Sequence, residues 1–299
     1  MEEYEKLIDL DPFTVVKWRM TEICNMTCPF CLRGNNGIDS NKKRLLSEAY
    51  FISHIKTDRP VKVELIGGEV TTIPFLEEIY DILKSKAARI QITTNTSKDS
   101  DYYNHLNKII ETTYTFSFHE KTKENPNGLT LDQYMNIVSK IQSPFFTLEM
   151  VSTNNNQEIV KEFIEKTKEY PNVMVDVDRS AISPFMDKSE TNLLHLARKE
   201  SKNYRYKLID LDKKEHFYYS KPELLVDYGN GKFIKTQDKL CDKTHYVYIE
   251  NHTVALQSHL PEECGKFVDI DSVKNINEAL KKKVCKLYGC TLCGHQSIL

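Results

Sequence analysis

The sequence lacks several features that would assign it to a special class of protein. None of its 299 residues lies in an uncharged apolar run of about 18 residues, so no transmembrane helix is expected. Residues 1–10 are acidic and lack the cationic and apolar regions of a secretory signal peptide, so we expect a cytoplasmic protein. The sequence also contains no internal repeat and no low-complexity segment.

An excess of charge of one sign is also missing. Lys and Arg together number 41, Asp and Glu number 43, and the formal net charge is −2. The sequence has no block of lysines and arginines that could bind the phosphates of a nucleic acid and release its counterions. Nucleic acid is therefore not expected as a general partner. The rest of the composition, 40% hydrophobic and 28% charged, is that of an ordinary globular protein with enough apolar residues for a sizeable core.

Short apolar, β-branched runs alternate with amphipathic segments through the first part of the chain. The expected strands are 14–20, 61–66, 89–94, 113–118, 145–151 and 173–177. The expected helices between them are 47–55, 74–85, 102–110, 131–141 and 157–168. Strands that alternate with helices predict an α/β fold with a parallel sheet, either curved into a partial barrel or open and doubly wound.

The pattern changes in the second part of the chain, where a polar, tyrosine-rich segment begins. Beyond it the sequence predicts a hairpin, 244–249 with 253–258, and a short helix at 275–283. We therefore expect three parts: an α/β domain at 1–184, a connecting segment at 185–235 that is a candidate substrate wall, and a small cysteine-rich hairpin-plus-helix domain at 236–299.

The chain contains eight cysteines, and in a reducing cytoplasm their expected use is metal binding or catalysis. Cys24, Cys28 and Cys31 form a C-x3-C-x2-C pattern directly after the first expected strand. Ligands of parallel α/β sheets bind at the loops beyond the carboxyl ends of strands, so this position suits an active site. Three thiolates from one short loop can hold three irons of a 4Fe–4S cluster and leave the fourth iron open. A zinc site that uses the same cysteines is the alternative.

This cysteine spacing, with the aromatic Phe30 just before the last cysteine, resembles the signature of the radical S-adenosylmethionine (radical SAM) superfamily. Two further stretches agree with that family in order: Gly67-Gly68-Glu69 after the second strand, and Thr93-Thr94-Asn95 at the end of the third. The second stretch departs from the family pattern because Thr96 replaces a glycine. The resemblance covers about residues 12–180 and implies a partial (β/α)6 barrel.

The resemblance also implies which residues would hold S-adenosylmethionine (SAM). These residues are Phe30 beside the adenine, Gly67, Gly68 and Glu69 at the methionyl amino group, Asn95, and Ser117 and Asn154 at the carboxylate or ribose. Ordinary strand-end capping is the alternative for Ser117 and Asn154. His119, just past Ser117, is either a base near the substrate or a surface histidine.

The chemistry of the family follows from an open iron. In its members SAM chelates that iron, and one electron from the reduced cluster cleaves SAM into methionine and a 5′-deoxyadenosyl radical. The radical abstracts hydrogen from a substrate, so the protein must orient the groups and exclude water. An electron donor such as flavodoxin or ferredoxin is therefore an implied partner.

The remaining cysteines, which follow residue 240, are Cys241, Cys264, Cys285, Cys290 and Cys293. This tail resembles the auxiliary-cluster domain called Twitch and its longer relative SPASM, which implies a second 4Fe–4S cluster. One cluster takes at most four thiolates, so one cysteine is spare. Candidates for a free thiol that returns a hydrogen atom to the substrate are Cys241, Cys264 and Cys285. The tail departs from the family pattern at the end of the hairpin, where His259 is a candidate ligand. A zinc site in the tail is the alternative.

The substrate is the least constrained part of the interpretation. Subfamilies with Twitch or SPASM tails act mainly on ribosomally made peptides, so we first expect epimerisation or cross-linking of such a peptide. A radical SAM dehydrogenase or related enzyme that acts on a sugar or other small molecule is the alternative. A zinc-stabilised binding protein is the non-enzymatic alternative.

Overall fold

The computed structural model describes most of the first part of the chain and selected segments of the second. The described residues are 6–9, 13–31, 38–57, 59–143, 146–153, 155–170, 172–177, 206–209, 215–218, 246–256 and 268–273. The chain divides into two compact units: one contains Met1–Lys17, Ile55–Val61 and Ser201–Leu299, and the other contains Trp18–His54 and Lys62–Glu200. The three-part division expected from the sequence stays a prediction.

The six strands expected from the sequence lie next to one another in chain order. They are β2 (Thr14–Thr21), β3 (Val61–Gly67), β4 (Ala87–Thr94), β5 (Thr112–Phe118), β6 (Phe146–Ser152) and β7 (Val173–Val177). Strands β4 to β7 pair in parallel, and their register places Ser117 of β5 opposite Glu149 of β6. The α/β fold with a parallel sheet is therefore confirmed.

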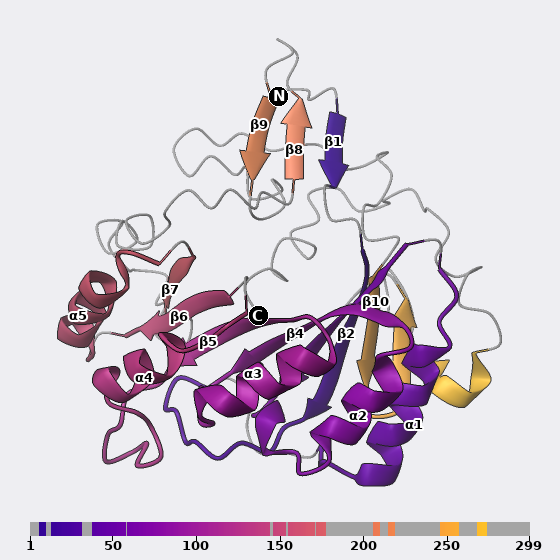
Figure 1. Cartoon of the computed structure of the whole chain (residues 1–299), viewed down its shortest axis with the longest axis horizontal. Helices are drawn as coiled ribbons and strands as arrows, with labels where there is room; N and C mark the ends of the chain where they lie inside the picture. Colours follow the sequence, from indigo (N-terminus) through magenta and orange to yellow (C-terminus); the bar gives the residue numbers. More distant parts are fainter. Residues whose placement is uncertain are drawn as a thin grey trace. The chain divides into compact units, whose positions relative to one another are not determined.

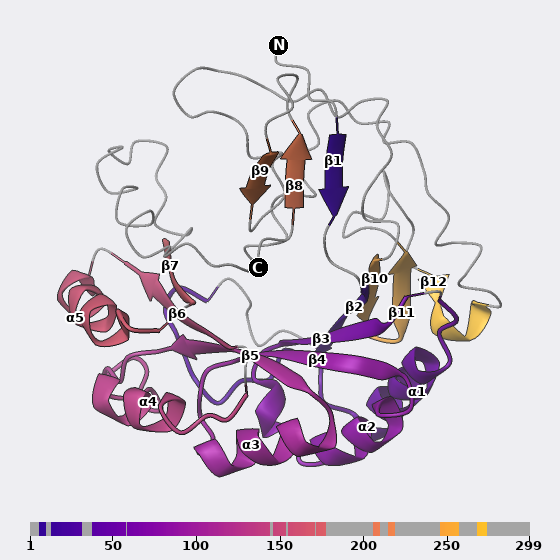
Figure 2. The same cartoon turned by 45° about the horizontal axis from the view of Figure 1, so that its top comes forward.

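Helices connect these strands, as predicted. They are α1 (Lys42–Ser53), α2 (Leu76–Leu83), α3 (Ser100–Ile109), α4 (Leu131–Val138) and α5 (Gln157–Thr167), with a short 3-10 turn, η1 (Val70–Thr72), after β3. Helices α1 to α4 lie along one face of the sheet (Figures 1 and 2). None of the described helices is long and apolar enough to cross a membrane.

Helix α1 begins five residues earlier than the apolar periodicity predicted. Its first residue follows Asn41, whose side-chain oxygen accepts a hydrogen bond of 3.0 Å from the backbone N–H of Arg44. Arg44 then pairs with the buried Glu48 one turn later at 2.8 Å, and Glu48 also accepts a hydrogen bond of 2.6 Å from Trp18. A polar cap and a buried ion pair therefore set the start of this helix.

An aromatic core joins the helices to the sheet. Its fully buried rings include Tyr103 of α3, Tyr114 and Phe116 of β5, and Tyr134 of α4. The Tyr114 hydroxyl donates to the backbone oxygen of Tyr103, and the Tyr134 hydroxyl donates to that of Phe116, both over 2.7 Å. Because these buried hydroxyls are hydrogen-bonded, the aromatic rings pack α3 and α4 against β5 without leaving an unpaired polar group.

The described residues of the second part of the chain form short strands. Strands β1 (Lys6–Asp9), β8 (Tyr206–Ile209) and β9 (Glu215–Tyr218) make an antiparallel sheet that the sequence did not predict, because each strand has only four residues. The hairpin of β10 (Tyr246–Glu250) and β11 (Thr253–Leu256) confirms the expected one, and its turn residues Asn251 and His252 have positive φ angles of 46° and 62°. Strand β12 (Val268–Asp269) pairs with β11, and a 3-10 turn, η4 (Ile270–Ser272), follows. The helix expected at 275–283 lies outside the described residues.

Candidate active site

The three cysteines of the C-x3-C-x2-C pattern lie in one loop after β2, where the sequence placed them. Cys24 and Cys28 are partly buried, and Cys31 is exposed. The backbone N–H of Met26 donates to the Cys24 sulfur over 3.4 Å, and the Asn95 amide donates to the same sulfur over 3.6 Å. Donors to a sulfur stabilise its thiolate, so the surroundings of Cys24 suit a metal ligand.

The electrostatics of this cysteine loop favour a bound cation. Burial, together with the neighbouring Cys24 and Cys31 sulfurs, raises the pKa of the Cys28 thiol to about 12. Burial also raises the pKa of Cys24, against the hydrogen bond from Met26. Three adjacent thiolates repel one another, and a coordinated metal removes that cost because it deprotonates its thiol ligands.

The spacing of the sulfurs separates the two metal interpretations. The sulfurs of Cys24, Cys28 and Cys31, all described by the structure, do not all lie within 4.8 Å of one another. A single tetrahedral zinc with Zn–S bonds of about 2.3 Å requires sulfurs only about 3.8 Å apart. A multi-iron cluster is larger than one ion and accepts a wider arrangement, so this donor set fits the cluster better than a single zinc.

The two glycines after β3 pack against the chain that leads into the cysteine loop. The Gly68 N–H donates to the Thr21 oxygen over 2.7 Å, and the Glu69 N–H donates to the Ile23 oxygen over 2.9 Å. A Cβ at Gly67 would lie 2.1 Å from the Thr21 oxygen, and one at Gly68 would lie 2.1 Å from the Ile23 oxygen. Only glycine permits this approach, so the two glycines set the position of the cysteine loop.

The Glu69 carboxylate is fully buried and joins the ends of β3 and β4. One of its oxygens accepts hydrogen bonds from the Thr71 N–H at 3.0 Å, the Thr71 hydroxyl at 2.6 Å and the Thr94 hydroxyl at 2.9 Å. The other oxygen accepts one of 2.6 Å from the Asn95 N–H. Burial raises the pKa of Glu69, whereas these four donors favour its ionised form. The contact with the methionyl amino group that the resemblance implies for Glu69 stays a prediction.

Asn95 places an unpaired acceptor beside the cysteine loop. Its side-chain N–H groups donate to the Asn25 side-chain oxygen over 2.8 Å and to the Cys24 sulfur. Its own side-chain oxygen is buried and has no hydrogen-bond partner among the described residues. A buried acceptor without a donor is costly unless a ligand satisfies it, so Asn95 fits a bound molecule with N–H or O–H groups.

Ser117, at the end of β5, contacts an acidic residue that the sequence analysis missed. Its hydroxyl donates to the Glu149 carboxylate of β6 over 3.0 Å. Tyr114, Phe116 and Phe118 of β5 pack into the aromatic core, so Ser117 points to the opposite face of the sheet, and Glu149 shares that face. The only sequence signal for Glu149 is one carboxylate within an otherwise apolar and hydroxyl-bearing strand.

The loop between β5 and α4, residues 119–130, holds the cysteine loop from the other side. The side-chain oxygen of Asn125, which is 3% exposed, accepts a hydrogen bond of 3.2 Å from the Thr27 N–H. Asn127 donates to the backbone oxygen of Asn25 over 2.7 Å. Neither residue was identifiable from the sequence, because each lies about a hundred positions from its partner and in a polar loop without periodicity.

Phe30 and His119 meet across these two loops. Their rings stack with centroids 5.7 Å apart and an interplanar angle of 15°, and His119 Nδ1 lies 3.2 Å from the Cys28 sulfur. Burial lowers the pKa of the His119 imidazole to about 4, so the ring is neutral at pH 7. His119 therefore contacts a cysteine of the loop and is only partly exposed.

Several expected site residues lie outside the described residues. They are Asn154 and the tail positions Cys241, His259, Cys264, Cys285, Cys290 and Cys293. Their expected roles stay predictions. The tyrosine-rich connecting segment is described only at β8 and β9, so its expected role as a substrate wall is also untested.

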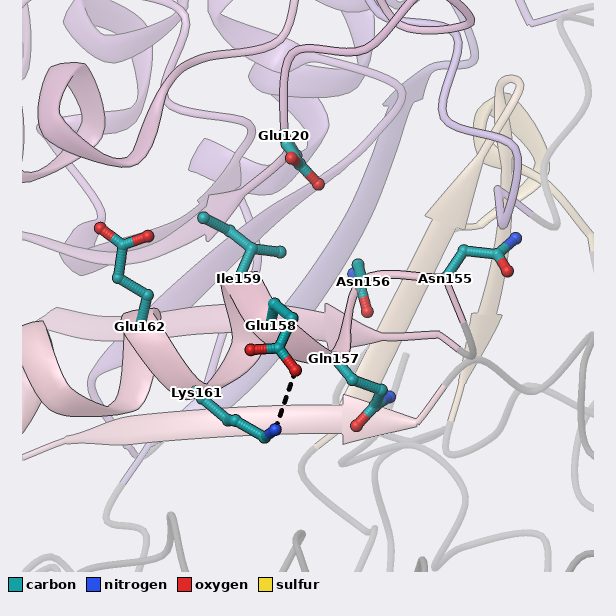
Figure 3. Close-up of a pocket in the computed structure, with 8 residues that line it drawn as sticks. All are labelled: Glu120, Asn155, Asn156, Gln157, Glu158, Ile159, Lys161 and Glu162. Atoms are coloured by element: carbon teal, nitrogen blue, oxygen red, sulfur yellow. Dashed lines mark hydrogen bonds and ion pairs between the residues drawn. The ribbon is translucent and has the colours of Figure 1, made fainter.

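A polar hollow of about 780 Å³ lies at the start of α5, beside Glu120 (Figure 3). Asn155, Asn156 and Gln157 line it, and the Lys161 ammonium pairs with the Glu158 carboxylate at 2.9 Å. Its described lining residues include none of the cysteines or expected SAM contacts that the structure describes. Small-molecule sites are mostly apolar with a few convergent polar groups, so we assign this polar hollow no role.

Comparisons with known proteins agree with the fold. No protein-family model matches the sequence, and no curated protein matches it. A structure of anSMEcpe with bound AdoMet and Cp18Cys peptide matches with a TM-score of 0.55 and 14% identity, over 89% of this chain and 79% of that chain. Streptococcus suis SuiB bound to S-adenosylmethionine matches with a TM-score of 0.55 and 14% identity, over 91% of this chain and 67% of that chain.

The extent of the match varies among structures of these proteins. For anSMEcpe with bound AdoMet alone, the TM-score is 0.45 at 15% identity, and the match covers 55% of this chain and 51% of that chain, about half of its length. Both anSMEcpe and SuiB are radical SAM enzymes. This chain therefore has the fold of the radical SAM enzymes, as the cysteine spacing and the Gly-Gly-Glu stretch predicted.

Proposed function

We propose that this chain is a radical SAM enzyme that reductively cleaves SAM and abstracts hydrogen from a substrate. The observation that carries the proposal is the cysteine loop at the carboxyl end of β2. Its three sulfurs are close enough to interact electrostatically, and the Gly67–Glu69 backbone and the Asn95 side chain hold the loop in place. Loops at the carboxyl ends of parallel strands are where α/β folds place their reactive groups.

In this proposal Cys24, Cys28 and Cys31 hold three irons of a 4Fe–4S cluster, and the fourth iron stays open for SAM. When bound, the cluster and SAM supply the electron and the hydrogen-abstracting radical. Among the protein groups, Asn95 offers its unpaired buried oxygen to a donor of the ligand. The stacked rings of Phe30 and His119 lie beside the partly buried Cys28.

We further propose a ribosomally made peptide as the substrate, modified by epimerisation or cross-linking. One structure with the same fold, that of anSMEcpe, contains a bound peptide together with AdoMet, which supports this class of substrate. The face of β5 and β6 that points away from the aromatic core carries Thr113, Thr115, Ser117, Thr147 and Glu149. Hydroxyl groups and one carboxylate suit hydrogen bonds to a peptide backbone.

The tail cysteines complete the proposal with a second 4Fe–4S cluster in a Twitch-like domain. The hairpin of β10 and β11 supports this interpretation, because it lies between Cys241 and Cys264 as in such domains. One thiol among Cys241, Cys264 and Cys285 would then remain free to return a hydrogen atom to the substrate.

The deciding experiment measures iron, sulfide and zinc in anaerobically reconstituted protein. The wild type is compared with a Cys24→Ala/Cys28→Ala/Cys31→Ala triple variant, and 5′-deoxyadenosine is assayed with dithionite and SAM. We expect about eight irons in the wild type and about four in the variant, which makes no 5′-deoxyadenosine. About four irons that fall to none would leave the first cluster and reject the second. Zinc without iron in both proteins would reject the proposed function.

The substrate class is tested with short peptides encoded beside the gene. A candidate peptide deuterated at its Cα positions is incubated with enzyme, SAM and dithionite, and 5′-deoxyadenosine is examined by mass spectrometry. Transfer of deuterium into 5′-deoxyadenosine is the expected result. Turnover of a sugar or other small molecule, with no deuterium transfer from any encoded peptide, would favour the small-molecule alternative.

A further inference from the structure

His119 is placed to act on a cluster ligand through a hydrogen bond. Its Nδ1 lies 3.2 Å from the Cys28 sulfur, within the range of a hydrogen bond to sulfur. In a free thiol either atom can be the donor. A thiolate bound to iron has no proton, so the sulfur can only accept and Nδ1 must carry the N–H.

The surroundings of His119 fix the direction of this N–H. Phe30, from the cysteine loop itself, stacks on the imidazole at 5.7 Å with the ring planes 15° apart. The backbone oxygen of His119 accepts a hydrogen bond of 2.9 Å from the Leu129 N–H, which closes the β5–α4 loop. The buried Asn125 then ties that loop to Thr27. The His119 ring is therefore held by Phe30 on one of its faces, and its backbone is held by Leu129. Because the side chain is preorganised in this way, its hydrogen bond to Cys28 costs little conformational entropy.

A second donor acts on the same set of ligands. The Asn95 amide lies 3.6 Å from the Cys24 sulfur and is positioned by Asn25. The sulfurs of Cys24 and Cys28 therefore each have a side-chain donor. Hydrogen bonds to the sulfurs are among the factors that set the potential of an iron–sulfur cluster, because they stabilise the more negative, reduced form.

We propose that His119 is a positioning residue whose Nδ1–H bond to Cys28 raises the reduction potential of the cluster bound by Cys24, Cys28 and Cys31. The inference rests on the proposed function, since it requires the cluster. It assigns His119 a role in electron uptake and none in proton transfer to the substrate. The effect belongs to the cluster itself and is present without SAM.

The test is a redox titration of the SAM-free cluster followed by EPR of its reduced state. His119→Leu keeps an apolar volume against Phe30 and removes the donor, whereas His119→Asn keeps an N–H close to the position of Nδ1. We expect the equilibrium constant for reduction to fall about tenfold in His119→Leu, which is 59 mV for one electron. His119→Asn should return most of the shift.

A loop variant separates this effect from simple loosening of the site. Asn127→Ala removes the 2.7 Å bond to the Asn25 backbone and touches no sulfur, so it should lower cluster retention without moving the potential. Equal potentials in wild type and His119→Leu, with iron content unchanged, would overturn the inference and leave the proposed function intact. A wild type without iron would instead mean that the proposed function itself fails.

A measurement on the wild type covers the case in which His119→Leu does not retain its cluster. Protein labelled with ¹⁵N-histidine is reduced, and pulsed EPR is used to detect coupling between the cluster and a histidine nitrogen. The coupling is expected in the wild type and absent from labelled His119→Asn, which binds the cluster through the same cysteines. Absence of the coupling in the wild type would overturn the inference.

Discussion

The ends of β3 and β4 both hold the cysteine loop in place, but different constraints act on their residues. After β3, Gly67 and Gly68 lie so close to the Thr21 and Ile23 oxygens that any Cβ would clash. After β4, Thr96 occupies a left-handed conformation with φ of 62°, which ordinarily favours glycine. The residues after β3 are constrained because a Cβ has no space there, and Thr96 after β4 is constrained only by its φ angle.

The difference shows which glycines of the family pattern are replaceable. A steric clash with backbone atoms has no local remedy, because the cysteine loop would have to move. Strain at one φ angle costs about 1–3 kcal/mol and persists where the surroundings fix the residue. Thr96 is fully buried, and its hydroxyl donates to the Ser117 oxygen over 3.4 Å, so the packing around it fixes this conformation.

The largest effect is expected from Gly68→Ala. Its Cβ would meet three backbone atoms, the nearest being the Ile23 oxygen at 2.1 Å. We expect a loss of about 3 kcal/mol in the free energy of unfolding, the upper end of ordinary overpacking costs, together with weaker iron retention. Urea unfolding and iron analysis measure the two effects.

Thr93→Ala is the matched control at the other strand end, because Thr93 is exposed and is the second-last residue of β4. It should cost less than about 1 kcal/mol, the span of strand propensities. If Gly68→Ala unfolded at the same urea concentration as Thr93→Ala, the close packing of β3 on the cysteine loop would be wrong.

An intermediate effect is expected from Glu69→Gln, which disrupts the hydrogen bonds that the Glu69 carboxylate makes between the ends of β3 and β4. The amide has one oxygen in place of two, so its NH₂ would face either the Asn95 N–H or the donors of Thr71 and Thr94. Leaving buried donors unpaired costs about 1–3 kcal/mol, and we expect about 2 kcal/mol here. The shift of the urea midpoint measures it.

Glu78→Gln is the control for the loss of charge alone. Glu78 is on the exposed face of α2 and pairs with Lys42 at 2.5 Å, and exposed pairs of this kind contribute little. Its expected change is below about 0.5 kcal/mol. Equal midpoints for the two glutamine variants would contradict the role of Glu69 as a buried acceptor.

The sequence predicted those parts of the site that follow directly from a strand. Cys24, the Gly67–Glu69 stretch and Asn95 each lie within a few residues of an apolar run, and parallel strands bring their carboxyl ends to one edge. The partners that hold the cysteine loop from outside were not predictable. Asn125 and Asn127 act on residues about a hundred positions earlier, and pairing of that kind leaves no periodic signal.

Elements of the fold with a periodic apolar pattern were predicted, and elements without one were missed. Strands β2 to β7 were found because short apolar runs alternate with helices that bury one face. Strand β1 pairs with β8, about two hundred residues later, and has only four residues, two of them charged. Helix α1 was predicted five residues short, because a cap and a buried ion pair determine its start and apolar spacing does not.

The smallest effect is expected from Thr96→Gly, which relieves the strain after β4. Glycine adopts φ of 62° freely, but the substitution removes the long hydrogen bond to the Ser117 oxygen and increases the chain entropy of the unfolded state, and both changes lower stability. The relief of about 1–3 kcal/mol and these losses oppose one another, so we expect a net gain of about 1 kcal/mol. The urea midpoint should therefore rise slightly.

Thr96→Ala isolates the strain from the lost hydroxyl, because alanine keeps a Cβ and loses the same hydrogen bond. It should be less stable than wild type, and the difference between the alanine and glycine variants should be at least about 1 kcal/mol. If the two variants unfolded together, φ strain at Thr96 would be negligible. The β4 end would then tolerate its threonine without cost, and space at the β3 end would be the only strict requirement on these two strand ends.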